Sequence, residues 1–264
     1  MALTGKSPSD TYKDLLEIDN SNSGVDNTAR EIKTGNGAST SLKVSDRSCI
    51  VTSSTDNTGA FYVQDSGDNI KFQVDTTNDQ VKALGKHINT QYAHFNVGGD
   101  TQATSFADDT HQAIPFSQGL YSNRMFPPAF GTGTDPATSF TTSEGNQTRA
   151  SDLVTCMWFL DLPITIDAVT CLEGADTATG DTTRMHLFSY DFTSGSTSAL
   201  TNGTLLAHNS DTTNAGSEQA YKSTMTIDSA NVAKDKVILA AFRADSVNSD
   251  YSLRIGVRYH ITGT

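Results

Sequence analysis

Histidine and acidic side chains are the residues of this chain that could perform acid–base chemistry or bind a metal ion. The histidines show no H-x-x-x-H or H-E-x-x-H spacing, which would place two metal ligands on one helix face. They are His87, His94, His111, His186, His208 and His260. His111 follows Asp108 and Asp109 in an acidic loop that a proline bounds, where we expect a solvated turn rather than a ligand cluster. His186 lies in an alternating apolar segment, where a partly buried and hydrogen-bonded imidazole is expected.

Three carboxylates, Asp161, Asp167 and Glu173, flank the apolar run around Trp158, the only tryptophan. A glycosidase would need two of them at a defined separation in space. Solvation at the edge of a sheet needs no such arrangement, and it is the interpretation that we prefer. The sequence also lacks a G-x-S-x-G elbow, a P-loop and a G-x-G-x-x-G motif after a strand. It therefore predicts a protein that is not an enzyme, with no catalytic residue, no metal and no cofactor.

The elements that position these residues are predicted to be strands, and the clearest of them covers residues 251–262. Tyr251, Leu253, Ile255, Val257, Tyr259 and Ile261 alternate there with polar residues. This period of two is typical of a half-buried strand, because successive side chains of a strand point to opposite faces. One face then belongs to a core. The other carries Arg254, Arg258 and His260, which suit either solvent or a neighbouring subunit that offers acceptors.

The rest of the C-terminal half also has the pattern of strands. Residues 153–162 form a nearly continuous apolar run, which predicts a strand buried on both faces. Further strands, separated by loops rich in Ser, Thr, Gly, Asn and Asp, are predicted at 184–192, 203–208, 220–228 and 236–244. Several antiparallel strands without a helical period predict a β-sandwich of the jelly-roll type.

The N-terminal third predicts a meander of short hairpins that follows one short helix beginning at Ser7. Turn-forming clusters separate its strands, which are expected at 41–44, 48–51, 60–63, 70–74 and 80–84. Ile70, Phe72, Val74 and Val81 could cover only one thin sheet face, and such a small apolar surface would not stabilise a single copy. We therefore expect identical copies to associate.

Three regions follow from these patterns, and all of them belong to an all-β protein. They are an N-terminal attachment and stalk module at 1–85, an irregular neck at 86–140 and a C-terminal β-sandwich head at 141–264. The neck contains many large apolar residues and is expected to be ordered, because a flexible linker would not normally carry them.

Charge and cysteine usage narrow the range of partners. The formal net charge of -12 makes a nucleic-acid partner unexpected, because such proteins depend on basic surfaces. No apolar run approaches the length of a signal peptide or a membrane span, so we expect folding in a cytoplasm and no membrane insertion. Cys49, Cys156 and Cys171 have no zinc-site spacing, and the last two lie in apolar runs where buried thiols are expected.

Residues 2–16 (ALTGKSPSDTYKDLL) and 19–25 (DNSNSGV) resemble the N-terminal module of structural proteins from tailed bacteriophages, particularly of marine hosts. The segment 72–78 (FQVDTTN) is similar to hairpins in phage fibre stalks. The resemblance covers the first third of the chain, and over the C-terminal half it is architectural only. It implies a homotrimer on the virion surface, as a tail fibre, spike or capsid decoration, with no catalytic residues.

The sequence thus predicts a non-enzymatic phage virion protein, a trimeric surface fibre of the tail-fibre or spike type that assembles in the host cytoplasm. Its partners would be copies of itself, other virion proteins of the capsid or tail, and a host surface glycan. Phe72 and Val74 are the expected trimer interface. The alternatives are a capsid decoration or head-fibre protein and a carbohydrate-binding module.

Receptor contact is expected at the loops of the head, because loops tolerate change while strands hold them in place. The candidate loops are 174–183, 193–202 and 210–219, whose short polar side chains suit hydroxyl-rich ligands. Tyr190, Phe192 and Tyr221 are the aromatic residues predicted to stack on such a ligand. The alternative for these loops is a set of solvated turns with no ligand.

Overall fold

The computed structural model describes residues 16–21, 23–97, 111–116, 150–176, 179–195, 200–216, 218–245 and 250–262. Strands predominate in these ranges and form several antiparallel sheets, so the predicted all-β class is confirmed. The chain divides into two compact units, Met1–Ile88 and Asn89–Thr264. The helix predicted to begin at Ser7 lies outside the described residues, apart from Leu16, with which strand β1 begins.

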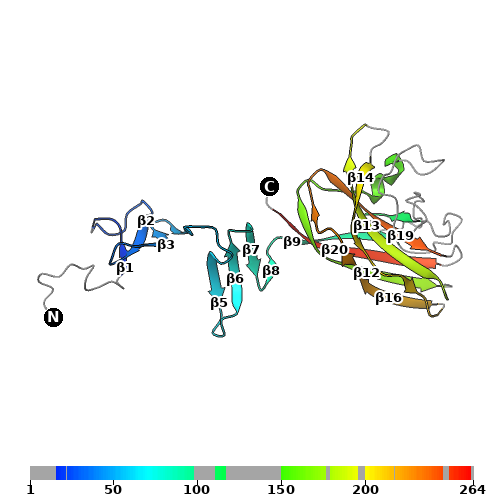
Figure 1. Ribbon diagram of the computed structural model, residues 1–264, viewed down its shortest axis with the longest axis horizontal. Coiled ribbons are helices and arrows are strands. Elements are labelled where there is room, and N and C mark those ends of the chain that lie inside the picture. Colours follow the sequence, from blue (N-terminus) through cyan, green and yellow to red (C-terminus); the bar gives the residue numbers. More distant parts are fainter. Residues whose placement is uncertain are drawn as a thin grey trace, which may run out of the picture. The chain divides into compact units, whose positions relative to one another are not determined.

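Two four-stranded antiparallel sheets form the first unit, and in each of them the strands follow one another in chain order. The first sheet consists of β1 (Leu16–Ile18), β2 (Arg30–Thr34), β3 (Ser39–Val44) and β4 (Cys49–Val51). The second consists of β5 (Phe61–Gln64), β6 (Ile70–Asp75), β7 (Gln80–Ala83) and β8 (Lys86–His87). These strands appear in blue and cyan in Figure 1, and they confirm the predicted meander of short hairpins.

Acidic residues close the hairpins of the second sheet. Asp65 Oδ1 accepts hydrogen bonds from the backbone amides of Gly67 and Asn69, at 2.9 and 3.0 Å. Lys71 Nζ lies 2.8 Å from the same carboxylate, and together with the two amides it lowers the pKa of Asp65 to about 2. Asp75 accepts two backbone amides in the next hairpin in the same way. Such side-chain acceptors fix the turns and with them the register of the strands.

Apolar burial distinguishes the two units. Every buried hydrophobic side chain among the described residues belongs to the second unit. In the described part of the first unit the only buried side chain is that of Asp75, with 4% of its surface exposed. The described part of the first unit therefore has no hydrophobic core within a single chain.

Two larger antiparallel sheets form the second unit. The seven-stranded sheet consists of β10 (Gln112–Ile114), β11 (Trp158–Phe159), β13 (Thr182–Phe192), β14 (Leu200–His208), β15 (Thr212–Thr213), β17 (Thr226–Ile227) and β19 (Lys236–Ala244). The five-stranded sheet consists of β9 (Thr90–Val97), β12 (Ile164–Asp176), β16 (Glu218–Thr224), β18 (Asn231–Val232) and β20 (Asp250–Ile261). Both sheets contribute side chains to one core cluster.

Strand β20 occupies the interior of the five-stranded sheet, between β12 and β9 (Figure 1). Its predicted alternation is confirmed, because Tyr251, Leu253, Ile255 and Val257 are buried in the shared core. The buried thiol of Cys171 lies in the neighbouring β12, as predicted, and burial raises its pKa to about 12.

The seven-stranded sheet is buried on both of its faces, which explains the continuous apolar sequences of β13 and β19. One face belongs to the core shared with the other sheet, and the other face forms a second cluster around Tyr190, Val237 and Leu239. The 3-10 helix η1 (Ala150–Cys156) adds Leu153 and Cys156 to this second cluster. A strand that is buried on both faces carries apolar residues at successive positions, so apolar and polar residues do not alternate along it.

The predicted strand at 153–162 is wrong over most of its length, because η1 occupies residues 150–156 and only Trp158–Phe159 form a strand. A short continuous apolar run does not distinguish a buried strand from a buried helix. Leu153 and Cys156 are three residues apart, which places both side chains on one face of a 3-10 helix.

The division of the chain differs from the predicted boundaries near the start of the neck. The first unit ends at Ile88, and within the predicted neck both β9 and β10 are strands of the second unit. Phe95 of β9 and Ile114 of β10 are fully buried in its core. Phe95 is one of the large apolar residues from which an ordered neck was predicted. The rest of that range, 98–110 and 117–140, lies outside the described residues.

Candidate functional site

The sheet formed by β5 to β8 has one apolar and one polar face. Residues opposite one another on neighbouring strands share a face, and Phe61 faces Val74, Val63 faces Phe72, and Phe72 faces Ala83. This pairing places Phe61, Val63, Phe72, Val74, Val81 and Ala83 on the face. Ile70 pairs with Gln64 beyond a register shift, and we include it because it continues the alternation of Phe72 and Val74 along β6. We call this set the apolar stalk face. The opposite face carries Gln73, Lys82 and other polar residues.

The apolar stalk face is left largely uncovered within one chain. Phe61, Val63 and Ile70 have 40%, 47% and 40% of their surface exposed, and Phe72 and Val74 are half-buried. The only ring contact recorded for the described part of this face is Phe61 against Phe72, edge to face at 6.2 Å between centroids. The structure thus places the predicted interface residues Phe72 and Val74 at the centre of a larger apolar surface. In the sequence, the alternation of apolar with polar residues along these strands also indicated which other residues lie on the apolar stalk face.

The sheet formed by β1 to β4 also carries exposed apolar side chains, but charged and apolar residues share its faces, because Arg30 lies opposite Val44 and Ile50 lies opposite Lys43. Ile18 faces Ile32, and Leu42 faces Val51. The other side carries charges, with Glu31 accepting a hydrogen bond from Ser39 at 2.8 Å. Val51 has 41% of its surface exposed. Both sheets of the first unit therefore present apolar side chains that this chain does not cover.

The three loops predicted to contact a receptor lie at two ends of the second unit. The segment 174–183 includes the end of β12 and the start of β13, and the segment 210–219 includes β15 and the start of β16, so both predicted loops are partly strand. Gly180 N donates to the Asn214 carbonyl at 2.8 Å, and Asn214 N donates to the Asp181 carbonyl at 2.9 Å. The loop 193–202 follows the far end of β13, whose 11 residues span roughly 35 Å. A small ligand can therefore touch the first two loops of one chain, but not all three.

The three aromatic residues predicted to stack on a receptor are not brought together. Tyr190 is fully buried in the second core cluster, so its assignment to a ligand surface is corrected: no ligand reaches its ring there. Phe192 has 39% of its surface exposed and makes an edge contact with Phe159. Tyr221 is half-buried and pairs with Glu173 in the five-stranded sheet, where its hydroxyl hydrogen-bonds Gln219 and accepts the Ala215 amide at 3.1 Å.

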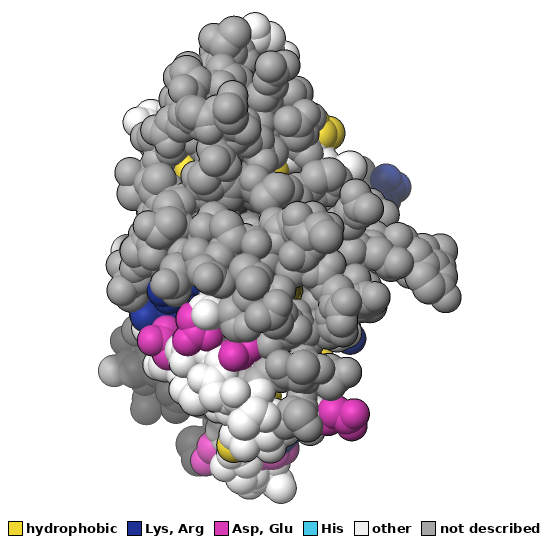
Figure 2. Space-filling view, turned by 90° about the vertical axis from the view of Figure 1, so that its right-hand side faces the viewer, with side chains coloured by type: hydrophobic (Ala, Val, Ile, Leu, Met, Phe, Trp, Pro, Cys, Tyr) yellow, Lys and Arg dark blue, Asp and Glu magenta, His cyan; other side chains and the backbone are white. Residues whose placement is uncertain are grey.

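Acidic side chains are prominent on the surface, as the acidic composition of the chain predicts. Figure 2 shows a group of Asp and Glu side chains on one face of the molecule, beside a smaller number of Lys and Arg. Several described acids pair with cations, among them Asp26 with Arg30 at 2.9 Å and Asp19 with Lys33 at 2.7 Å. These exposed pairs contribute little to stability.

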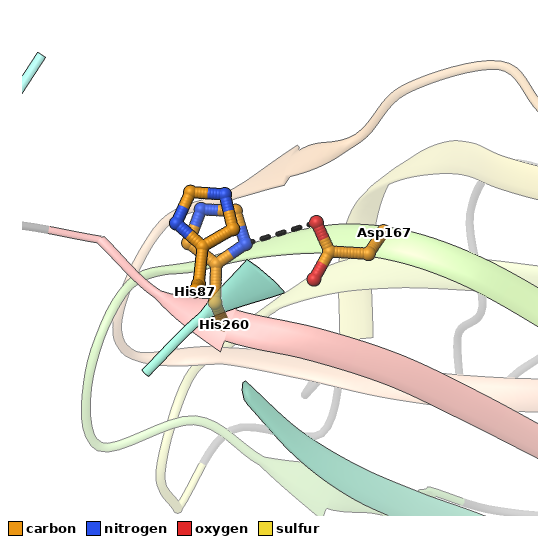
Figure 3. A group of neighbouring side chains, drawn as sticks. All are labelled: His87, Asp167 and His260. Atoms are coloured by element: carbon orange, nitrogen blue, oxygen red, sulfur yellow. Dashed lines mark hydrogen bonds and ion pairs between the residues drawn. The ribbon is translucent and has the colours of Figure 1, made fainter. Parts of the chain in front are cut away.

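A histidine–aspartate pair lies near the end of β20 (Figure 3). His260 Nδ1 and Asp167 Oδ1 are 3.0 Å apart, and 7% and 20% of their side-chain surfaces are exposed. Asp167 is the extra residue of a β-bulge, because the register between β12 and β20 shifts between Ile166 and Ala168. A bulge redirects a side chain from its regular face. The pair joins the bulge of β12 to β20 and orients the imidazole.

Two other histidines are buried in the seven-stranded sheet. His111 is fully buried, so the expectation of a solvated turn there is wrong: it immediately precedes β10, which pairs with the buried strand β19. Its ring lies 4.7 Å from that of His186, between centroids. His186 is also fully buried, and the expected burial at this position is confirmed.

Glu173 is a buried carboxylate on the core side of β12, with 3% of its surface exposed. Thr183 Oγ1 donates to it, at 2.9 Å from both carboxylate oxygens. Burial raises the pKa of Glu173, and hydrogen bonds from Thr183 and Asn214 offset part of this effect. The sequence placed this residue at a solvated sheet edge, which the structure contradicts because Glu173 points to the same side as Cys171 and Ala175.

We expect the substitution Glu173→Gln to raise the melting temperature at pH 8 by several degrees. A raised pKa in the folded state means that stability is full below the ordinary glutamate pKa of about 4.3 and is lost as the pH rises through the folded-state value. Glutamine keeps a neutral acceptor for Thr183 at every pH, and ~1 kcal/mol corresponds to about 2–4 °C in a domain of this size.

Thermal unfolding of both proteins at pH 4 and pH 8 tests this expectation. The two melting temperatures should agree at pH 4 and differ at pH 8. Glu218→Gln, which removes an exposed carboxylate of β16, is the matched control and should give no such difference. Equal melting temperatures of the Glu173→Gln variant and the original protein at both pH values would contradict the argument.

No model of a known protein family matches the chain, and neither does any curated protein. The described part of the chain contains no helix with the length and hydrophobicity that crossing a membrane requires.

Proposed function

We propose that this chain is a non-enzymatic structural protein of a tailed-bacteriophage virion, a homotrimeric surface fibre of the tail-fibre or spike type. The first unit would be its attachment and stalk region, and the second unit its head, an antiparallel β-sandwich of the jelly-roll type. The resemblance of residues 2–25 and 72–78 to phage structural proteins points to this class. Other virion proteins, of the capsid or the tail, would hold the first unit.

One observation carries the proposal: the described part of the first unit contains no buried hydrophobic side chain, although one of its sheets has an apolar face. A unit of this size without a core is not stable by itself, because burial of apolar surface is the main favourable contribution to folding. Closed symmetric association of identical chains supplies the missing burial without any other partner. Exposed apolar surface that continues over several strands is typical of such interfaces.

The features of the second unit fit a head that folds within each chain. Two clusters of buried side chains stabilise it, and both sheets contribute to the larger cluster. Its strands hold loops at both ends, which supports a role in contacting a host surface. Two of the three carboxylates considered for catalysis have structural partners, since Asp167 pairs with His260 and Glu173 with Thr183. These contacts support a binding protein over an enzyme.

Sedimentation equilibrium of the full chain tests the proposal. At micromolar concentration we expect a single species of three times the 28.2 kDa mass of one chain. A stable, folded monomer under these conditions would overturn the proposal, because the apolar stalk face would then need no partner. A reconstruction of intact virions with labelled protein would then distinguish a tail fibre from a capsid decoration.

A further inference from the structure

The outward face of the five-stranded sheet contains a depression of about 340 Å³. It lies on the side of the sheet opposite the core, because its residues Arg254, Gly256 and Arg258 alternate along β20 with the buried Ile255 and Val257. Its volume falls within the range of about 300–1,000 Å³ that is common for small-molecule sites. We call it the sheet-face pocket.

Gly256 forms the floor of the sheet-face pocket. It lies opposite His94 of β9 on one side and Thr170 of β12 on the other. A Cβ atom at this position would lie 3.4 Å from His94 Nδ1 and 3.8 Å from the Thr170 carbonyl oxygen. The absent side chain therefore leaves room between the two neighbouring strands, which a larger residue would fill.

Three cations surround this floor in a chain that carries a formal net charge of -12. Arg254 and Arg258 flank Gly256 on β20, and Lys222 reaches the pocket from β16. None of the residues that line the pocket is acidic. Among the described residues, no carboxylate pairs with any of the three, and the nearby Asp167 is already bonded to His260. The pocket thus offers positive charge that no described side chain neutralises.

His94 orients one of these cations. Arg254 Nη2 lies 3.4 Å from His94 Nε2. Burial lowers the pKa of His94, and Arg254 lowers it further. The imidazole is therefore neutral at pH 7 and can accept a hydrogen bond from the guanidinium. The remaining N–H groups of Arg254 are available to a ligand, and a guanidinium binds carboxylates and sulfates through paired donors.

Apolar surface lines the same pocket. Tyr92 has 66% of its surface exposed and lies opposite Arg258, and Leu172 has 44% exposed and lies opposite Lys222. Exposed Tyr beside Arg is the combination that dominates binding energy at many interfaces. A simple inorganic anion makes no favourable contact with an aromatic ring. The C–H groups of a sugar ring, in contrast, can pack against one. The Cα atoms of Arg254 and Arg258 are about 13 Å apart along the strand, enough for two linked sugars.

We propose that the sheet-face pocket binds an anionic sugar unit of a polysaccharide, one that carries a carboxylate or a sulfate ester. Arg254, Arg258 and Lys222 contact the charged group, the ring of Tyr92 stacks against the sugar, and Gly256 makes room for it. This inference rests on the proposed function only for the origin of the ligand, which would be a polysaccharide of the host surface. Binding at the pocket does not require the trimer. The site lies on strands, away from the loops where receptor contact was predicted.

Isothermal titration of the full chain with two defined probes tests the site. The probes are a trimer of galacturonic acid and a sulfated galactose oligomer, with the methyl ester of the uronate trimer and inorganic sulfate as reference ligands. We expect at least one charged oligomer to bind, with an affinity that falls as salt rises. The methyl ester should bind the protein at least tenfold more weakly than the free uronate. Which oligomer binds identifies the acidic group.

Variants show whether binding occurs at this pocket. We expect Arg254→Gln and Arg258→Gln each to weaken binding roughly tenfold, because each removes a charge-assisted hydrogen bond. Tyr92→Ala leaves the charges in place. It should weaken binding of the sugar more than tenfold and leave binding of inorganic sulfate unchanged. Gly256→Ala should reduce binding by filling the floor. Lys234→Gln, which removes one exposed charge from the turn before β19, is the matched control and should bind as the original protein does.

Three outcomes would overturn the proposal. The first is no binding of either charged oligomer, and the second is inorganic sulfate binding as tightly as the sugar. The third is loss of the trimer in Arg254→Gln or Arg258→Gln, which would assign this face to contacts between chains. Sedimentation of the same samples separates the two proposals: an unchanged trimer without sugar binding contradicts the site alone, and a monomer that binds the sugar contradicts the fibre alone.

Discussion

Replacing Phe72 with aspartate is expected to abolish the proposed homotrimer. Phe72 lies at the centre of the apolar stalk face, opposite Val63 on one side and Ala83 on the other, and in edge contact with Phe61. A carboxylate buried in an apolar interface without a partner costs several kcal/mol. Threefold symmetry would place three such charges close together. We expect the sedimenting species to fall to the mass of one chain, with loss of strand signal from the first unit.

The neighbouring residue of the same strand supplies a matched control. Gln73 points to the polar face of the sheet, where its side chain donates to the Thr58 carbonyl. Gln73→Asp introduces the same charge and removes one exposed hydrogen bond, so the trimer should persist. If the Phe72→Asp variant were a trimer of unchanged melting temperature, the apolar stalk face would not be the interface between chains.

Removing residues 250–264 is expected to prevent the second unit from folding. Strand β20 pairs along its length with both β12 and β9, so its loss leaves a gap inside the sheet. It also removes Leu253, Ile255 and Val257, each at most 3% exposed. A buried aliphatic side chain contributes about 1.5–3 kcal/mol, and a typical domain is stable by about 5–15 kcal/mol. Circular dichroism and thermal unfolding of the truncated chain measure the effect.

Point substitutions in the same strand make this test quantitative. Ile255→Ala should destabilise the unit by about 2–5 kcal/mol, because it leaves a cavity in the shared core. Ser252→Ala, on the exposed face of β20, should change stability by less than about 0.5 kcal/mol. A soluble truncated protein with an unchanged melting transition would mean that β20 is peripheral to the fold.

Period-two alternation predicted the strands that are buried on one face. β20 and β6 carry apolar side chains mainly on one side. The sequence pattern therefore predicts both where each strand begins and ends and which of its sides is apolar. Residues 153–156 of the 3-10 helix were included in a predicted strand because a short continuous apolar run has no period that distinguishes a buried helix from a buried strand. Strand β9 was missed because residues 86–140 were interpreted together as an irregular neck, although β9 occupies Thr90–Val97.

The sequence indicated the surface position of candidate residues where a single strand carries the signal, and not where several strands meet. Alternation alone placed Phe72 and Val74 on an apolar face. Alternation could not show that Tyr190 is buried, because the residues that pack around it belong to η1 and β19, which are distant from it in the sequence. The sequence did place Arg254 and Arg258 on the outward face of β20. Lys222 and Tyr92 join them only through the pairing of strands that are far apart in the sequence.

The pairing of β9 with β20 determines when the second unit can fold during synthesis. His94 and Arg254, which meet in this pair, are separated by 160 residues of sequence. At about 5–20 residues per second, a ribosome needs roughly 8–32 s to reach β20 after β9. During this interval β9, with Ala93, Phe95 and Val97 on its core side, lacks its neighbouring strand β20, and only the short bridge between Phe95 and Phe116 can form. A nascent chain therefore exposes this apolar strand to chaperones and to other chains until the partner strand leaves the ribosome.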